Sequence, residues 1–212
     1  MSPIKFRCLW FTAFALFCSA LILGGQSTGQ GSVARFEATN GQTTRLASPG
    51  GRYALVFTDK ATVANSSRYL KLWFEDNLSH SRSLILGVNT DAFAGWSPDG
   101  RAFYVENDWL SDRTYAYIYK AGSLDKLDIA DRIYAADAEA RRFKNAHSYF
   151  NVERWQDNKN LLVRFDGHSD SYPVACFDLR YLVSRSGTVK NLSQRTGPAG
   201  ATGCLDLNLN NR

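Results

Sequence analysis

The amino-acid sequence predicts a mainly β protein built from antiparallel strands, with one short helix. Short runs of β-branched and aromatic residues alternate with turn signals along most of the chain, which is the pattern of antiparallel strands joined by short connections. In addition, one pattern of a turn followed by a strand occurs three times in the middle of the sequence. The length of 212 residues fits one ordinary domain or two very small ones, and not a multidomain enzyme.

Residues 1–25 are predicted to be a leader. An uncharged apolar run over residues 8–25 follows Lys5 and Arg7, which is the layout of a secretory signal peptide. The run is close to the lower limit of about 17 residues for a spanning helix, so a retained N-terminal anchor is the alternative. We therefore expect an exported protein, periplasmic or secreted, that contacts a membrane only if the leader is retained. Residues 26–41 are expected to form a linker.

The charge of the chain gives no reason to expect a nucleic-acid partner. The formal net charge is +5, but Lys5 and Arg7 belong to the predicted leader, and without them 23 basic side chains face 20 acidic ones, or +3. Lysine and arginine are interspersed with aspartate and glutamate, so no concentrated positive field is expected.

The repeated pattern is clearest in residues 96–106, where Trp-Ser-Pro-Asp-Gly-Arg precedes an apolar strand. Pro98 presets one backbone angle of the turn, and Gly100 accepts the strained one. The pattern recurs 49 residues earlier in 48–57 and 59 residues later in 155–165, where Asp-Asn replaces Pro-Asp. Two further strands are predicted after each copy, namely 69–74 and 82–86, 114–119 and 126–129, and 174–184 and 188–192. The aligned copies predict equivalent buried places for Trp96 and Trp155 before the turns, and for Phe57, Val105 and Phe165 after them.

A period near 50 residues with about four strands per unit is what a β-propeller blade requires. The Trp96–Arg101 turn and the closing segment Gly-Thr-Val-Lys-Asn-Leu-Ser at 187–193 resemble the WD40-like repeats of Tol-system periplasmic propellers and of prolyl-oligopeptidase-type propellers. The resemblance covers about residues 42–193 and implies a propeller-like domain over 42–195, followed by a Gly- and Asn-rich tail over 196–212. Only three units are recognisable, whereas a closed propeller normally needs four or more. An incomplete or small propeller, a hidden fourth unit and a β-sandwich therefore stay open.

One segment departs from the β pattern. Residues 131–144 are rich in helix-forming residues and begin with a capping aspartate, Asp131. Ile133, Ala136, Ala140 and Phe143 would form a narrow apolar stripe, so we expect a single short helix that packs on the sheet.

The cysteines predict one disulfide and no metal site. Cys8 and Cys18 fall in the leader, which leaves Cys176 and Cys204 to pair in an oxidising compartment and tie the tail to the strand around Cys176. No Cys-x-x-C pair or zinc-type Cys and His spacing is present, and no cofactor is expected.

Binding residues are expected on the loops between the second and third strands of the units, over 59–68, 107–113 and 166–172. Equivalent loops of neighbouring blades converge on one rim, so charged and aromatic side chains there could bind a peptide, a glycan or a protein surface. An ordinary solvated rim is the competing interpretation. The candidate rim residues are Asp59, Lys60, Arg68, Asp108, Trp109, Asp112, Arg113, Asp166, His168 and Asp170.

Two functions follow from the sequence as hypotheses. The sequence has no Gly-x-Ser-x-Gly elbow and no glycine-rich phosphate loop between a strand and a helix. The first hypothesis is therefore an exported binding or scaffold module that recognises a protein, a peptide or an envelope component. The second is a small hydrolase or glycan-active enzyme that uses the rim side chains Asp108, Asp112, Asp166, His168 or Asp170.

Overall fold

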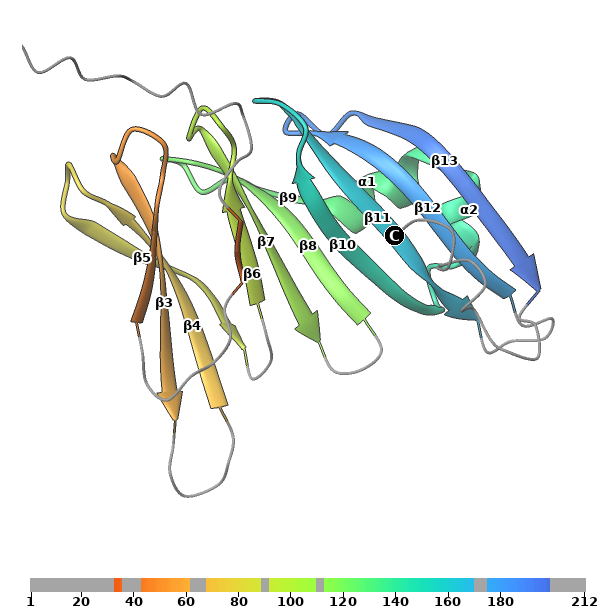
Figure 1. The fold of residues 1–212 in the computed structure, drawn as a ribbon, viewed down its shortest axis with the longest axis horizontal. Coiled ribbons are helices and arrows are strands. Elements are labelled where there is room, and N and C mark those ends of the chain that lie inside the picture. The colour runs from red at the N-terminus through yellow and green to blue at the C-terminus, as the bar shows by residue number, and fades with distance from the viewer. Residues whose placement is uncertain are drawn as a thin grey trace, which may run out of the picture.

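The computed structural model describes residues 33–35, 43–61, 68–88, 92–109, 113–169 and 175–198 (Figure 1). Within these residues the chain forms three successive four-stranded units. Unit 1 consists of β2 (Thr43–Ala47), β3 (Tyr53–Ala61), β4 (Arg68–Asp76) and β5 (Ser81–Val88). Unit 2 consists of β6 (Ala92–Trp96), β7 (Ala102–Trp109), β8 (Arg113–Lys120) and β9 (Lys126–Asp128). Unit 3 consists of β10 (His147–Trp155), β11 (Asn160–Ser169), β12 (Ala175–Ser184) and β13 (Val189–Pro198).

The predicted fold class is confirmed, because the described chain is mainly β with antiparallel sheets and short helices. Each unit is an antiparallel meander in which consecutive strands pair, as a propeller-like unit requires. The second and third strands predicted after each turn all form, as β4 and β5, β8 and β9, and β12 and β13.

The sheets are less separate than the repeat predicts. Unit 1 is a four-stranded sheet of its own, whereas units 2 and 3 belong to one nine-stranded sheet. The join is a short parallel pairing of β8 with β10, with Arg113 opposite Ser148 and Thr114 opposite Tyr149. The strand β1 (Val33–Arg35), inside the segment expected to be a linker, adds to this sheet by pairing with β6. At the other end β13 runs to Pro198, past the predicted boundary of the domain at residue 195.

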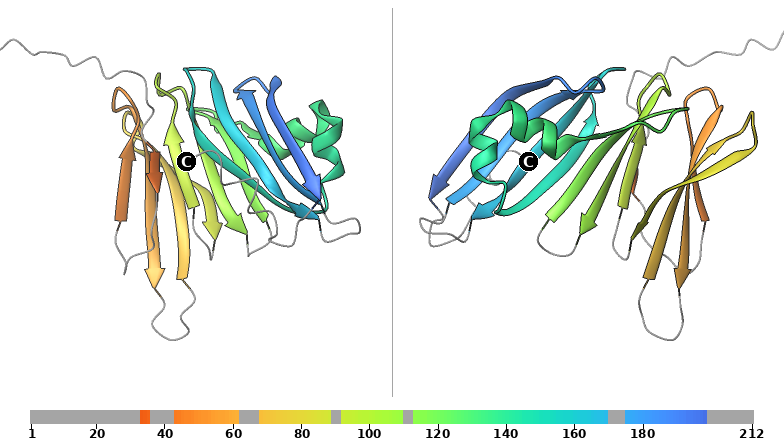
Figure 2. Two further views of the ribbon diagram at one scale, coloured as in Figure 1. Left: turned by 45° about the vertical axis from the view of Figure 1, so that its right-hand side comes forward. Right: turned by 180° about the vertical axis from the view of Figure 1, so that it is seen from behind.

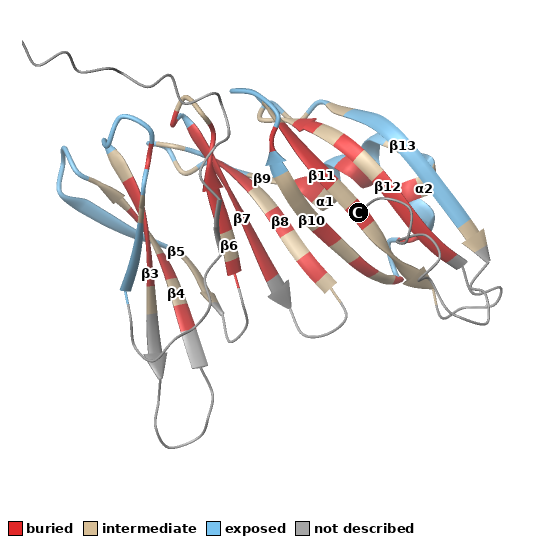
Figure 3. Cartoon of the chain, viewed as in Figure 1, coloured by how far each residue is buried: buried red, intermediate tan, exposed pale blue. Residues whose placement is uncertain are grey.

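Two hydrophobic clusters hold the units together, and Figure 3 shows the buried residues in red. The first lies between units 1 and 2 and is made by side chains such as Leu55, Phe57, Phe74, Trp96 and Phe103, all buried. The second is made by one face of unit 3, by residues of β7 and β8, and by the helices, which cover that face in the rear view of Figure 2. Burial of large apolar side chains at about 25 cal/mol per Å² makes these clusters the main source of stability.

The two tryptophans that precede the turns are confirmed as equivalent and buried. Trp96 is fully buried and Trp155 is 2% exposed. The Trp96 indole N–H donates to the carbonyl oxygen of Leu46 at 3.0 Å, and the Trp155 indole N–H donates to that of Gly95 at 3.2 Å. Leu46 and Gly95 occupy the same place in the first strands of units 1 and 2. Each tryptophan therefore fastens its unit to the unit before it.

The predicted equivalence of Phe57, Val105 and Phe165 is wrong, although all three are buried. The strand partner of Trp96 is Phe103 and that of Trp155 is Leu161, so the third turn is one residue shorter than the second. The equivalent pair in unit 1 is Ala47 with Ala54, so the counterparts of Val105 are Val56 in unit 1 and Val163 in unit 3. The shorter turn is closed by Asp157, which accepts hydrogen bonds from the Lys159 and Asn160 amides.

The single predicted helix is two helices, α1 (Ile129–Ala136) and α2 (Ala138–Arg142). Asp128, and not Asp131, caps α1 by accepting a hydrogen bond from the Asp131 amide. The helix is interrupted at Asp137, whose extended backbone ends α1 and whose side chain caps α2. Ile133, Ala140 and Phe143 of the predicted stripe are buried, but the break turns Ala136 to solvent. In the described part of the chain no helix is both long and apolar enough to span a bilayer. The predicted leader lies outside the described residues.

Candidate functional site

The candidate rim residues lie mostly on strands and less on loops than expected. Asp59 and Lys60 belong to β3, Arg68 to β4, Asp108 and Trp109 to β7, and Asp166 and His168 to β11. The strands extend further than their sequence pattern indicates, so residues 166–169, which belong to the predicted loop over 166–172, continue β11. Asp112 and Asp170 lie outside the described residues. For five further residues the structure describes the backbone only; they are Asp59, Lys60, Arg68, Asp108 and Trp109.

The three rim side chains that are described occupy two different places. Arg113, at the start of β8, lines a small cavity of about 130 Å³ with Asp128, Tyr134 and Lys144. Asp166 and His168 lie on the face of unit 3 that is turned away from the helices. The His168 ring stacks on that of His147 with 4.8 Å between the ring centroids.

Asp166 belongs to a polar layer on that face of unit 3. Asn151 donates a hydrogen bond to Asp166 at 2.7 Å, and the Arg164 guanidinium lies 3.6 Å from the carboxylate. Arg164 also makes two hydrogen bonds, of 3.0 and 3.2 Å, to Asp178. Burial raises the pKa of Asp166 above its ordinary value and the nearby Asp178 charge adds to this effect, against the opposing effect of Arg164. A carboxyl group of this kind keeps its proton to higher pH than an exposed one.

A second and larger depression lies where units 2 and 3 meet near the turns. We call it the basic hollow. Its volume is about 550 Å³, and its floor is formed by Ala102, Ile118, Tyr119 and Leu127. Five cationic side chains line it together with one acidic side chain, Asp125. They are Arg101, Lys120, Lys126, Arg132 and Arg185.

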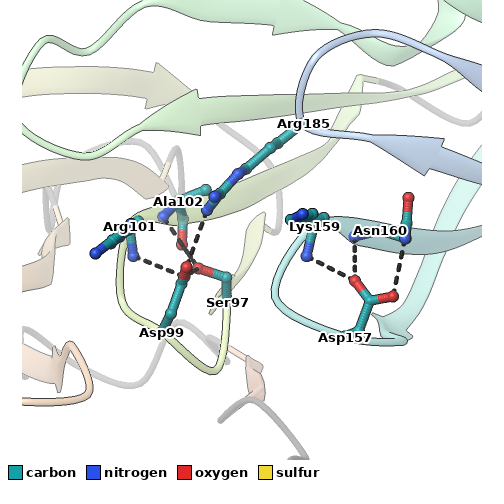
Figure 4. Close-up of polar contacts among 8 residues, drawn as sticks. All are labelled: Ser97, Asp99, Arg101, Ala102, Asp157, Lys159, Asn160 and Arg185. Atoms are coloured by element: carbon teal, nitrogen blue, oxygen red, sulfur yellow. Dashed lines mark hydrogen bonds and ion pairs between the residues drawn. The ribbon is translucent and has the colours of Figure 1, made fainter.

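An ion pair between units 2 and 3 holds one edge of the hollow (Figure 4). The Arg185 guanidinium donates to Asp99 of the Ser-Pro-Asp-Gly turn at 3.0 Å. Asp99 also accepts hydrogen bonds from the Ser97 hydroxyl at 2.7 Å and from the Arg101 amide at 3.1 Å. Burial raises the pKa of Asp99, but these hydrogen bonds and Arg185 outweigh it and bring the pKa below the ordinary value. The carboxylate is therefore charged at neutral pH and orients Arg185.

The basic hollow has almost no signature in the sequence. Arg101 belongs to the recognised turn motif and was the one available signal. The other four cations come from the end of β8, from β9, from α1 and from the turn between β12 and β13. Residues from such distant segments meet only through the packing of the two units. In the described part of the chain, no group of three or more His, Cys, Asp or Glu side chains is arranged to hold a metal ion.

Comparison with known proteins gives a distant structural likeness. No protein-family model matches the chain, and no curated protein matches its sequence. Among solved structures, the chain is similar to the acylaminoacyl peptidase of Pyrococcus horikoshii, with a TM-score of 0.42 and 11% sequence identity. The match covers 81% of this chain and 25% of the peptidase, so the chain spans about a quarter of that protein's length. At this distance the likeness says nothing about activity.

Proposed function

We propose that this protein is an exported binding or scaffold module that recognises a protein, a peptide or an envelope component. The observation that supports it is the basic hollow, in which five cationic side chains surround an apolar floor. Binding sites combine an apolar surface with a few fixed polar groups, and volumes of about 300 to 1,000 Å³ are usual for them. The resemblance of the repeats to propeller repeats agrees with a binding role but does not fix one.

A small hydrolase is the second candidate, because of Asp166. Burial raises the pKa of Asp166, which is the direction that a general acid requires, and His168 lies on the same face of the sheet. The contacts of Asp166 with Arg164 and Asn151 explain its setting equally well as part of a structural layer.

One experiment separates the two candidates. The full chain is immobilised and exposed to panels of peptides, glycans and lipid vesicles, and is screened in parallel against ester, peptide and glycoside substrates. The binding module predicts saturable binding without turnover. Turnover that is abolished in Asp166→Ala or His168→Ala would support the hydrolase. Absence of binding in every panel would overturn the module.

Export and the disulfide belong to the same proposal. Cys176 is buried in β12, whereas Cys204 lies outside the described residues. If the chain is exported, we expect these two cysteines to be oxidised to each other. Alkylation of the exported protein without reduction, followed by mass measurement, should label neither cysteine. We expect Cys204→Ser to loosen the tail more than the β core. Labelling of both cysteines in the exported wild type would count against the bridge.

A further inference from the structure

We infer that the basic hollow binds an acidic peptide segment, with its carboxylates on the surrounding cations and an apolar side chain on the floor. This inference rests on the proposed binding function and names the ligand of its site. Among the described residues, the cations that line the hollow outnumber the acidic groups that pair with them. Five cations face one lining acid, Asp125, and that carboxylate already accepts a hydrogen bond from the Ser123 hydroxyl at 2.7 Å.

Three of the cations have no acidic partner among the described residues. Arg101, Lys120 and Arg132 make no ion pair there, and all three are exposed. Lys126 lies over the Tyr117 ring, with 4.4 Å between its ammonium nitrogen and the ring centroid. Arg185 alone is paired, with Asp99. An anion entering the hollow would therefore find uncompensated positive charge, which favours its association.

The Arg185 guanidinium is positioned before any ligand arrives, and the Arg132 side chain lies beside the floor. Asp99 orients Arg185 and uses one of its N–H groups, while a guanidinium has five to donate. Arg132 packs against the backbone of Gly187, where a Cβ atom would come within 3.2 Å of its Nε and 3.1 Å of the Leu127 side chain. Gly187 therefore leaves room for Arg132 beside the floor. Guanidinium groups held in place lose less side-chain entropy when they bind carboxylates.

The floor and the size of the hollow favour a peptide over a small inorganic anion. Ala102, Ile118 and Tyr119 are buried beneath it, and its volume of about 550 Å³ is that of a site for a drug-sized ligand. A phosphate site typically uses a cradle of converging backbone amides. The positive groups of this hollow are instead side chains, and they come from separate elements around the floor. Separate carboxylates on either side of an apolar residue match this arrangement.

The test measures binding of a short fluorescein-labelled peptide of alternating glutamate and leucine to the full chain by fluorescence anisotropy. We expect saturable binding that weakens as salt is added, and none for the same peptide with glutamine in place of glutamate. Arg132→Glu and Lys120→Glu should each weaken binding about tenfold or more. The matched control is Lys190→Glu, an exposed lysine of β13 outside the hollow, which should bind as the wild type does. Melting temperatures show whether each variant folds.

The outcomes distinguish this inference from the broader function. Binding of the glutamate peptide that neither charge reversal weakens would overturn the hollow as its site and leave the binding module standing. Stronger competition by pyrophosphate, or by vesicles of phosphatidylglycerol and phosphatidylcholine, would overturn the peptide in favour of a phosphate ligand. Failure of every ligand panel described above would overturn the module itself.

Discussion

Asp137 links the helices to the last two strands of unit 3 through four hydrogen bonds. One carboxylate oxygen accepts hydrogen bonds from the Glu139 amide at 2.8 Å and the Ala140 amide at 3.4 Å. The other accepts from the Tyr181 hydroxyl at 2.8 Å and the Asn191 side chain at 2.7 Å. The residue thus starts α2 and fastens the helices to β12 and β13. Burial raises the pKa of Asp137, but the hydrogen bonds outweigh it and bring the pKa below the ordinary value.

Replacing Asp137 should destabilise the protein in a pH-dependent way. We expect Asp137→Ala to lower the free energy of unfolding by about 2 to 3 kcal/mol at pH 7, because a cap and the partner of a buried hydroxyl are lost. Tyr181→Phe, which removes one of the bonds, should cost about 1 kcal/mol. Since the native pKa is depressed, the contribution is complete above about pH 4, the pKa of an unfolded aspartate, and is lost as pH falls through the native pKa. Urea denaturation from pH 7 to pH 3 tests this. A difference between wild type and variant that stays constant over that range would contradict it.

At the scale of elements, the close approach of β10 and β11 depends on Gly167. This glycine lies within β11 with φ +154°, and a Cβ atom built on it would overlap the carbonyl oxygen of His147. The same atom would come within 2.9 Å of the Phe177 ring on the other neighbouring strand. In the sequence Gly167 falls in the predicted loop over 166–172, whereas in the fold it lets three strands pack closely.

Gly167→Ala should therefore be strongly destabilising. We expect a loss of about 3 kcal/mol in the free energy of unfolding, because β10 would have to move away from β11. Gly197→Ala in β13 is the matched control, since a Cβ atom there meets nothing within 4 Å, and it should change stability by no more than about 0.5 kcal/mol. Thermal and urea unfolding of both variants measure the difference. Equal effects of the two substitutions would show that the close approach does not limit stability.

At the scale of the whole molecule, the outer faces of units 1 and 3 carry layers of ion pairs. On unit 1, Glu75 bridges Arg45 at 3.1 Å and Arg82 at 3.5 Å. On unit 3, Arg180 pairs with Glu153 at 3.2 Å, beside the Arg164 pairs. End units of a stack need polar outer faces to remain soluble, and these layers provide them.

Removing one such pair should make the molecule associate. On β12, Arg180 lies two residues from Leu182, which pairs with Leu162 of β11. Replacing both Glu153 and Arg180 by leucine would join the two new leucines to this leucine pair as one apolar patch. We expect this double variant to fold and to associate in a concentration-dependent way in sedimentation velocity, since large exposed apolar patches favour contact between molecules. The single variant Arg180→Lys keeps the charge and should sediment as the wild type does. Unchanged sedimentation of the double variant would show that the ion pairs do not keep the faces apart.

Features that depend on neighbouring residues could be predicted from the amino-acid sequence. The Trp-Ser-Pro-Asp-Gly-Arg turn, the alternation of apolar residues in the strands and the burial of Trp96 and Trp155 follow from local pattern, and the structure has them. Tertiary structure alone decided the break at Asp137, which depends on Tyr181 and Asn191, and the pairing of β8 with β10. It also decided the basic hollow, whose cations come from two units and a helix. These features require contacts between distant segments, and no local pattern encodes which distant side chains will meet.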